Sequence, residues 1–225
     1  MRFRKVLRSI LVAIPVIVAS PVLVLAIQGG MFLPVGMFIA IYSPWTPFVW
    51  FPQTKWLVTH TIWMTRAMRG TLIDVGWILI ALGFVVFIGS YIYFYSVRSR
   101  AGLVTNGPYA IVRHPQYLGI FMGLTGFTLL GARPIAVMAW ITAVCTYLAL
   151  MIYEEGENDR RFGERYHAYR DRVPFIIPLV PRGLTRLLTP VTALPRSAQY
   201  AGVAVLYVAL IAAAVSFLRD RAFPT

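Results

Sequence analysis

Two polar motifs interrupt an otherwise apolar chain, and they hold most of the residues that could do chemistry. The first runs from Asn106 to Gly119 and combines an Arg-His pair with tyrosines, prolines and glycines. The second is the acidic pair Glu154 and Glu155, at the end of the second apolar block after it. Ionisable groups near lipid are energetically costly. Their presence at the ends of apolar segments therefore indicates a functional site.

The first motif is suited to binding an anion. Pro115 keeps His114 out of the helical region, so the loop is expected to be stiff and a helix to begin directly after it. The free N–H groups at that helix start, together with Arg113 and His114, could hold a carboxylate or a phosphate. Tyr109 and Tyr117 could add hydroxyl hydrogen bonds, or aromatic faces for a cation.

The acidic pair complements this site. Glu154 and Glu155 could accept hydrogen bonds from an ammonium group or from ribose hydroxyls. Neighbouring side chains on a helix point about 100° apart, so we expect one of the two to face the site and the other the membrane interface. S-adenosylmethionine carries groups that match both motifs: a carboxylate, an ammonium, a sulfonium and ribose hydroxyls. The alternative is that these residues are headgroup anchors and a solvated helix end, which explains either motif better than both together.

Composition sets the class of protein. Hydrophobic residues make up 59% of the 225 residues and charged residues 13%, against about 45–50% and 25% in soluble domains. Mean hydropathy is +0.71. The chain is therefore expected to be an all-α, polytopic membrane helix bundle. We attribute the net charge of +13 to cytoplasmic loops and anionic headgroups, and not to nucleic-acid binding.

The apolar runs predict about five transmembrane helices, over residues 10–27, 71–97, 117–132, 134–153 and 198–218. Glycines in the third run allow close helix approach. Residues 31–52, rich in Pro and Trp, are predicted to form an interfacial or re-entrant segment, and 54–70 a surface connection. Residues 157–172 have the pattern of one amphipathic helix, either along the membrane interface or as a solvated surface helix.

Charge distribution predicts the topology. If 31–52 does not cross the membrane, most of the 21 basic residues lie on the same side as the N-terminus, as the positive-inside rule favours. Both motifs then face the cytoplasm, from an inner or plasma membrane. We expect a single membrane domain with a variable part at 1–70, a core at 71–178 and an extension at 179–225. Membrane lipids are the expected surroundings, and no obligate protein partner is inferred.

Three stretches in order carry a family resemblance. The motif from Asn106 to Gly119, then Tyr153-Glu154-Glu155, then the run from Arg161 to Pro178 resemble the isoprenylcysteine carboxyl methyltransferase and phospholipid methyltransferase superfamily. The resemblance covers about residues 71–178. It implies a membrane enzyme with a cytosol-facing pocket for S-adenosylmethionine. It also implies a lipophilic methyl acceptor that enters from the bilayer between helices.

The resemblance also assigns residues to the site. It implies a cofactor pocket that includes Arg113, His114, Tyr117 and Glu154 or Glu155. It further implies a C-terminal cap over this pocket, carrying Tyr166, Tyr169 and Arg172.

The mechanism expected from this chemistry is an in-line displacement, which requires no metal. A carboxylate or thiolate acceptor needs no general base, whereas an amine or phenol needs one, for which Glu155 and His114 are the candidates. Arg172 could orient an anionic acceptor. The acceptor itself stays open among an isoprenylcysteine-like carboxylate, a phospholipid amine, a thiol and a phenol.

Two other classes of protein are alternatives. Membrane sterol reductases, which bind NADPH, carry a related Arg-His pattern, but with Asn before the Tyr and an acidic residue after the Gly. Here these positions hold Gln116 and Ile120, which favours methyl transfer over hydride transfer. The second alternative is a non-enzymatic membrane protein, but no apolar span here carries the buried charge that a proton relay would need.

Overall fold

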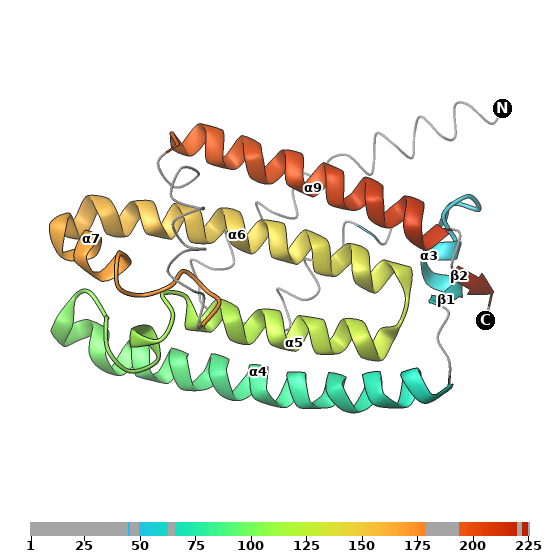
Figure 1. Cartoon of the computed structure of the whole chain (residues 1–225), viewed down its shortest axis with the longest axis horizontal. Coiled ribbons are helices and arrows are strands. Elements are labelled where there is room, and N and C mark those ends of the chain that lie inside the picture. The colour runs from blue at the N-terminus through green and yellow to red at the C-terminus, as the bar shows by residue number, and fades with distance from the viewer. Residues whose placement is uncertain (1–44, 46–49, 63–65, 179–193, 220–221, 225) are drawn as a thin grey trace. The chain divides into compact units, whose positions relative to one another are not determined.

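The computed structural model describes residues 45, 50–62, 66–178, 194–219 and 222–224 (Figure 1). Four long helices dominate these residues: α4 (Arg66–Ala101), α5 (Pro115–Gly131), α6 (Pro134–Phe162) and α9 (Arg196–Arg219). Shorter elements are α3 (Trp56–Thr59), the 3-10 helix η2 (Gly107–Ala110) and α7 (Glu164–Arg170).

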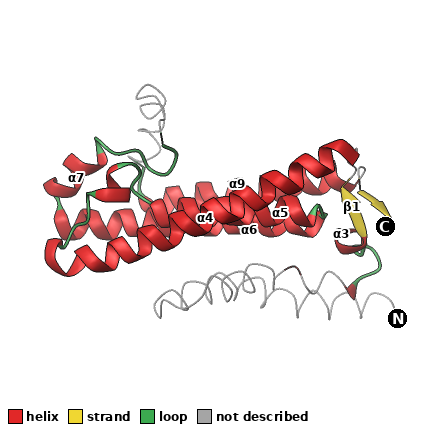
Figure 2. Ribbon diagram, turned by 90° about the horizontal axis from the view of Figure 1, so that it is seen from below, coloured by secondary structure: helices red, strands yellow, loops and turns green. Residues whose placement is uncertain are grey.

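Strands are almost absent from the described residues. The three-residue strands β1 (His60–Ile62) and β2 (Ala222–Pro224) pair antiparallel, with Thr61 opposite Phe223 (Figure 2). The all-α class predicted from the sequence is confirmed. The segment at 54–70, predicted as a plain surface connection, instead contains α3, β1 and the first turn of α4.

Three of the described helices are long and apolar enough to cross a membrane: Met68–Arg98, Pro134–Phe162 and Arg196–Arg219. They match three of the predicted spans, and the protein is an integral membrane protein. Helix α5 corresponds to a fourth, with only 17 residues. The predicted span at 10–27 and nearly all of 31–52 lie outside the described residues, so the total of about five spans stays a prediction.

Prolines start two of these helices. Pro115 and Pro134 are the first residues of α5 and α6, where the missing N–H costs nothing and the fixed φ suits a helix. Between the two helices, Ala132 adopts φ 43° to turn the chain. The predicted start of a helix just after His114 is confirmed.

Chain contacts divide the protein into two compact units. One combines Asp74–Phe127 with Tyr147–Leu206 and contains both polar motifs. The other combines Met1–Ile73, Thr128–Thr146 and Tyr207–Thr225. In this second unit the indole N–H of Trp45 donates to the hydroxyl of Thr142 at 3.0 Å, which satisfies a buried polar group.

Within the first unit, glycines let α4 and α5 pack backbone to backbone. A Cβ atom added at Gly119 would lie 2.6 Å from the backbone nitrogen of Phe87 and 2.7 Å from the carbonyl oxygen of Gly83. A Cβ atom at Gly126 would also collide with the backbone of α4, whereas one at Gly123 would have no atom within 4 Å. Gly119 and Gly126 therefore set the helix separation that holds the start of α5 in place.

The predicted amphipathic helix at 157–172 is wrong in one respect, because it is broken in two. Helix α6 continues to Phe162, and α7 begins at Glu164. Gly163 between them has φ 49° and ψ −126°, a backbone conformation that residues with a side chain rarely adopt. The helical spacing of apolar residues continues across the break, which is why the sequence pattern does not reveal it.

Candidate functional site

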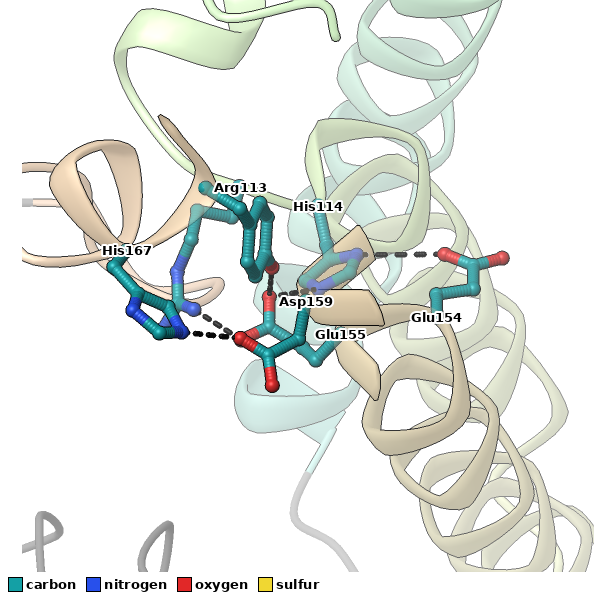
Figure 3. Close-up of polar contacts among 7 residues, drawn as sticks. Arg113, His114, Glu154, Glu155, Asp159 and His167 are labelled. Atoms are coloured by element: carbon teal, nitrogen blue, oxygen red, sulfur yellow. Dashed lines mark hydrogen bonds and ion pairs between the residues drawn. The ribbon is translucent and has the colours of Figure 1, made fainter. Parts of the chain in front are cut away.

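The two polar motifs meet where α5 begins and α6 ends, within one compact unit. His114 is buried, with 6% of its surface exposed, and lies between the two glutamates (Figure 3). Its Nε2 is 3.1 Å from Oε1 of Glu155, and its Nδ1 is 3.6 Å from Oε2 of Glu154. The loop motif and the acidic pair therefore form one cluster around this imidazole.

Both glutamates contact the cluster, so the expectation that one would face away is wrong. Glu155 pairs with Arg113 and His114, while Glu154 accepts a hydrogen bond from the hydroxyl of Tyr117 at 2.5 Å. Consecutive residues of a helix point about 100° apart, yet both glutamates reach the cluster, because His114 offers one ring nitrogen to each carboxylate. The environments differ, since the side chain of Glu154 is 41% exposed and that of Glu155 is 18% exposed.

Arg113 is fixed on several sides. Besides its ion pair with Glu155, its guanidinium lies over the ring of Phe175 at 5.3 Å, and its backbone N–H donates to the carbonyl of Pro174 at 2.9 Å. Its Nε is buried and has no hydrogen-bond partner among the described residues. Unpartnered buried donors are rare in native proteins, so this atom calls for an explanation.

Helix α7 covers the cluster with two buried tyrosines, the predicted cap residues Tyr166 and Tyr169. The hydroxyl of Tyr166 donates to Glu155, and that of Tyr169 donates to the backbone oxygen of Tyr109 at 2.7 Å. Burial raises the pKa of Tyr166, and the charge of Glu155 raises it further. Tyr166 therefore stays a phenol, and so a hydrogen-bond donor, at neutral pH.

Tyr109 lies at the edge of this arrangement. Its ring is buried and packs against Phe94, with the ring centroids 5.7 Å apart. Burial raises the pKa of Tyr109, as it does for Tyr169. The charge of Glu154 raises the pKa of Tyr109 further, so Tyr109 joins the cluster through its phenol as well as through its backbone oxygen.

The structure does not bring Arg172 into the cluster. Its side chain is exposed, and its Nε donates to the carbonyl of Ala168, one turn earlier in the chain, at 2.8 Å. Phe175 was not predicted from the sequence, but its ring meets that of His114 edge-on, with the ring centroids 5.0 Å apart. The signal was present in Val173-Pro174-Phe175, where an aromatic residue follows a helix-ending proline.

The cluster is a partly buried site that combines acidic and basic side chains. It holds two carboxylates, one guanidinium and an imidazole, lined by the aromatic rings of Tyr117, Tyr166 and Phe175. Such a site can accept hydrogen bonds from ammonium and hydroxyl groups and donate to a carboxylate. Among the described residues, no group of three or more His, Cys, Asp or Glu side chains is arranged to hold a metal ion.

Comparison with known proteins identifies the family. The family model for phospholipid methyltransferase matches residues 66–165. Protein-S-isoprenylcysteine O-methyltransferase B of Arabidopsis thaliana is 31% identical over 147 residues, which cover 64% of this chain and 72% of the relative. The chain belongs to the isoprenylcysteine carboxyl methyltransferase and phospholipid methyltransferase superfamily.

Shorter matches agree with this membership. Protein-S-isoprenylcysteine O-methyltransferase of Schizosaccharomyces pombe is 36% identical over 80 residues, covering 35% of this chain and 34% of the relative. That of Homo sapiens is 34% identical over 79 residues, covering 35% and 28%. These two matches thus span about a third of each relative's length. No solved structure gives a significant match.

These names settle the class of activity. The protein is a membrane methyltransferase, and so requires a methyl donor. All three relatives carry methyltransferase names, so neither the reductase nor the non-enzymatic alternative is favoured.

Proposed function

We propose that the methyl donor is S-adenosylmethionine and that it binds at the cluster of Arg113, His114, Glu154 and Glu155. The observation that carries this proposal is the buried, unpartnered Nε of Arg113. Leaving a buried donor unsatisfied costs about 1–3 kcal/mol. A ligand carboxylate would supply the missing acceptor and would face a guanidinium that is already held in place by Glu155 and Phe175.

The rest of the cluster fits the other groups of this donor. Glu154 and Glu155 offer acceptors for an ammonium group and for ribose hydroxyls, and the aromatic rings of Tyr117 and Phe175 suit a sulfonium cation. When bound, S-adenosylmethionine would supply an electrophilic methyl group, which the acceptor takes in line while the sulfur leaves as a neutral thioether. The residues of this chain contribute alignment and exclusion of water, with Tyr166 and Tyr169 covering the site.

We propose a lipophilic carboxylate of the isoprenylcysteine kind as the methyl acceptor. The relatives are named as methyltransferases of isoprenylcysteine, which supports this choice. The cluster supports it too, because His114 and Glu155 already engage each other and a carboxylate needs no base. A phospholipid amine is the second candidate, favoured by the description of the matching family model. For that acceptor, Glu155 or His114 would serve as the base.

We further propose that the site faces the cytoplasm from an inner or plasma membrane. Exposed basic residues gather at the end of α6 and on α7, beside the cluster: Arg160, Arg161 and Arg165. The positive-inside rule assigns such an end to the cytoplasm.

Two further expectations from the sequence remain proposals. One is the division of the chain into a variable part at 1–70, a core at 71–178 and an extension at 179–225. The other is that Arg172 orients an anionic acceptor.

Calorimetric titration of the full chain in detergent tests the donor assignment. We expect binding of S-adenosylmethionine and of its demethylated product, and no binding of NADPH. The titration contains no methyl acceptor, so it tests the donor assignment independently of the proposed acceptor. Binding of NADPH without any response to the methyl donor would overturn it.

A further inference from the structure

We infer that His167 and Asp159 form a latch that positions α7, and with it Tyr166, over the donor site. This inference rests on the proposed donor site, and it assigns a positioning role to two residues outside the cluster. The latch lies beside the junction between α6 and α7. Because Gly163 breaks the helix at φ 49°, α7 does not continue the course of α6, and contacts made by the side chains of α7 help to hold its direction.

Three side chains of α7 make such contacts. Tyr166 reaches Glu155 and Tyr169 reaches the backbone of η2, so both belong to the covered cluster. The third is His167, whose Nε2 contacts Oδ1 of Asp159 near the end of α6 (Figure 3). His167 is thus the tether of α7, among these three, that lies outside the cluster.

The contact between His167 and Asp159 fixes how α7 aligns along α6. Glu155 and Asp159 are four residues apart on α6 and so share one helix face. Their partners on α7 are the neighbouring residues Tyr166 and His167. Two adjacent residues of α7 therefore dock on two successive turns of α6. Releasing the outer contact would let α7 rotate about Gly163 and change where the Tyr166 hydroxyl lies.

The other charged group that faces His167 contributes little. Nδ1 of His167 lies 3.7 Å from Glu164, whose side chain is 98% exposed. The side chains of His167 and Asp159 are each 38% exposed. Contacts this exposed have modest strength, so we expect changes in donor affinity of about twofold to fivefold and no loss of folding.

Amide and ring geometry give a matched pair of variants. Glutamine places its amide nitrogen near the position of histidine Nε2, whereas asparagine places its own near Nδ1. His167→Asn should therefore raise the Kd and KM for S-adenosylmethionine by about twofold to fivefold with little change in kcat, and His167→Gln should behave like wild type. Asp159→Ala should raise the Kd and KM as much as His167→Asn does. The double variant, Asp159→Ala with His167→Asn, should raise them no further than either single variant.

Glu157→Gln is the control. It breaks the ion pair between Glu157 and Arg160, which lies within α6 and does not reach α7, so donor affinity should not change. Equal effects of His167→Gln and His167→Asn would overturn the latch. A defect of Glu157→Gln as large as that of His167→Asn would do the same.

Hydrogen exchange on the donor-free protein separates failure of the latch from failure of the proposed function. Amides of residues 164–172 should exchange faster in His167→Asn than in wild type, His167→Gln or Glu157→Gln. This readout needs no donor. If wild type binds no S-adenosylmethionine, the donor assignment fails while faster exchange still supports the latch. Unchanged exchange in His167→Asn overturns the latch whatever the donor proves to be.

Discussion

Glu155→Ala should weaken binding of S-adenosylmethionine about 30- to 1000-fold, which corresponds to about 2–4 kcal/mol. The carboxylate of Glu155 contacts Arg113, His114 and the hydroxyl of Tyr166. Its removal leaves a guanidinium that is only 9% exposed without its counter-charge, as well as taking an acceptor from the ligand. His114→Ala should fall in the same range, because His114 is the link between the two glutamates. Calorimetric titration of each variant measures the effect.

Alanine variants of two other glutamates of α6 should have smaller effects on donor binding. Glu154→Ala should have a smaller effect than Glu155→Ala, because the Glu154 side chain is 41% exposed and its contact with His114 is longer. Glu157→Ala is the matched control, since Glu157 lies on the same helix and pairs with Arg160 outside the cluster. Wild-type affinity in His114→Ala and in both cluster glutamate variants would show that the site assignment is wrong, even for a confirmed methyltransferase.

Gly119→Ala should lower the free energy of unfolding by about 1–3 kcal/mol, the usual cost of overpacking a tight contact. The added Cβ would lie 2.6 Å from the backbone nitrogen of Phe87, and backbone atoms cannot give way as a flexible side chain can. Because Gly119 lies in the first turns of α5, separating α4 from α5 should also shift His114 and weaken donor binding. Thermal denaturation in detergent measures the stability change.

Gly123→Ala is the control for this change. It lies on the same helix, and a Cβ there would have no atom within 4 Å. Alanine is the better helix former, so this variant should be neutral or slightly more stable than wild type. Equal loss of stability in both variants would mean that helix backbone effects, and not the close approach of α4 to α5, dominate.

Much of the architecture could be predicted from the sequence, because lipid imposes strong rules on composition. Apolar runs located three of the described spans to within a few residues, apart from the extension of α6 beyond residue 153. The pairing of the Arg113-His114 loop with the acidic pair was predictable for a related reason. Polar groups at the ends of apolar helices have few partners other than each other.

The failures have physical causes too. The prediction for the Glu pair used the angle between neighbouring helical residues and took no account of an imidazole with two polar edges between them. The helical spacing of apolar residues continues through Gly163, so the break in the helix is visible only in the backbone angles of that residue. The contact between Asp159 and His167 joins residues that look like ordinary surface positions in the sequence.

Transfer of a labelled methyl group by the purified protein tests the central claim most directly. The assay supplies labelled S-adenosylmethionine with either a prenylated cysteine derivative bearing a free carboxylate or phosphatidylethanolamine. Transfer to the carboxylate makes an ester, which mild alkali cleaves to release labelled methanol, whereas a methylated amine resists alkali. We expect alkali-labile label on the prenylated carboxylate, lost in Glu155→Ala and kept in Glu157→Ala. Alkali-stable label on the phospholipid alone, or transfer that survives Glu155→Ala, would contradict this account.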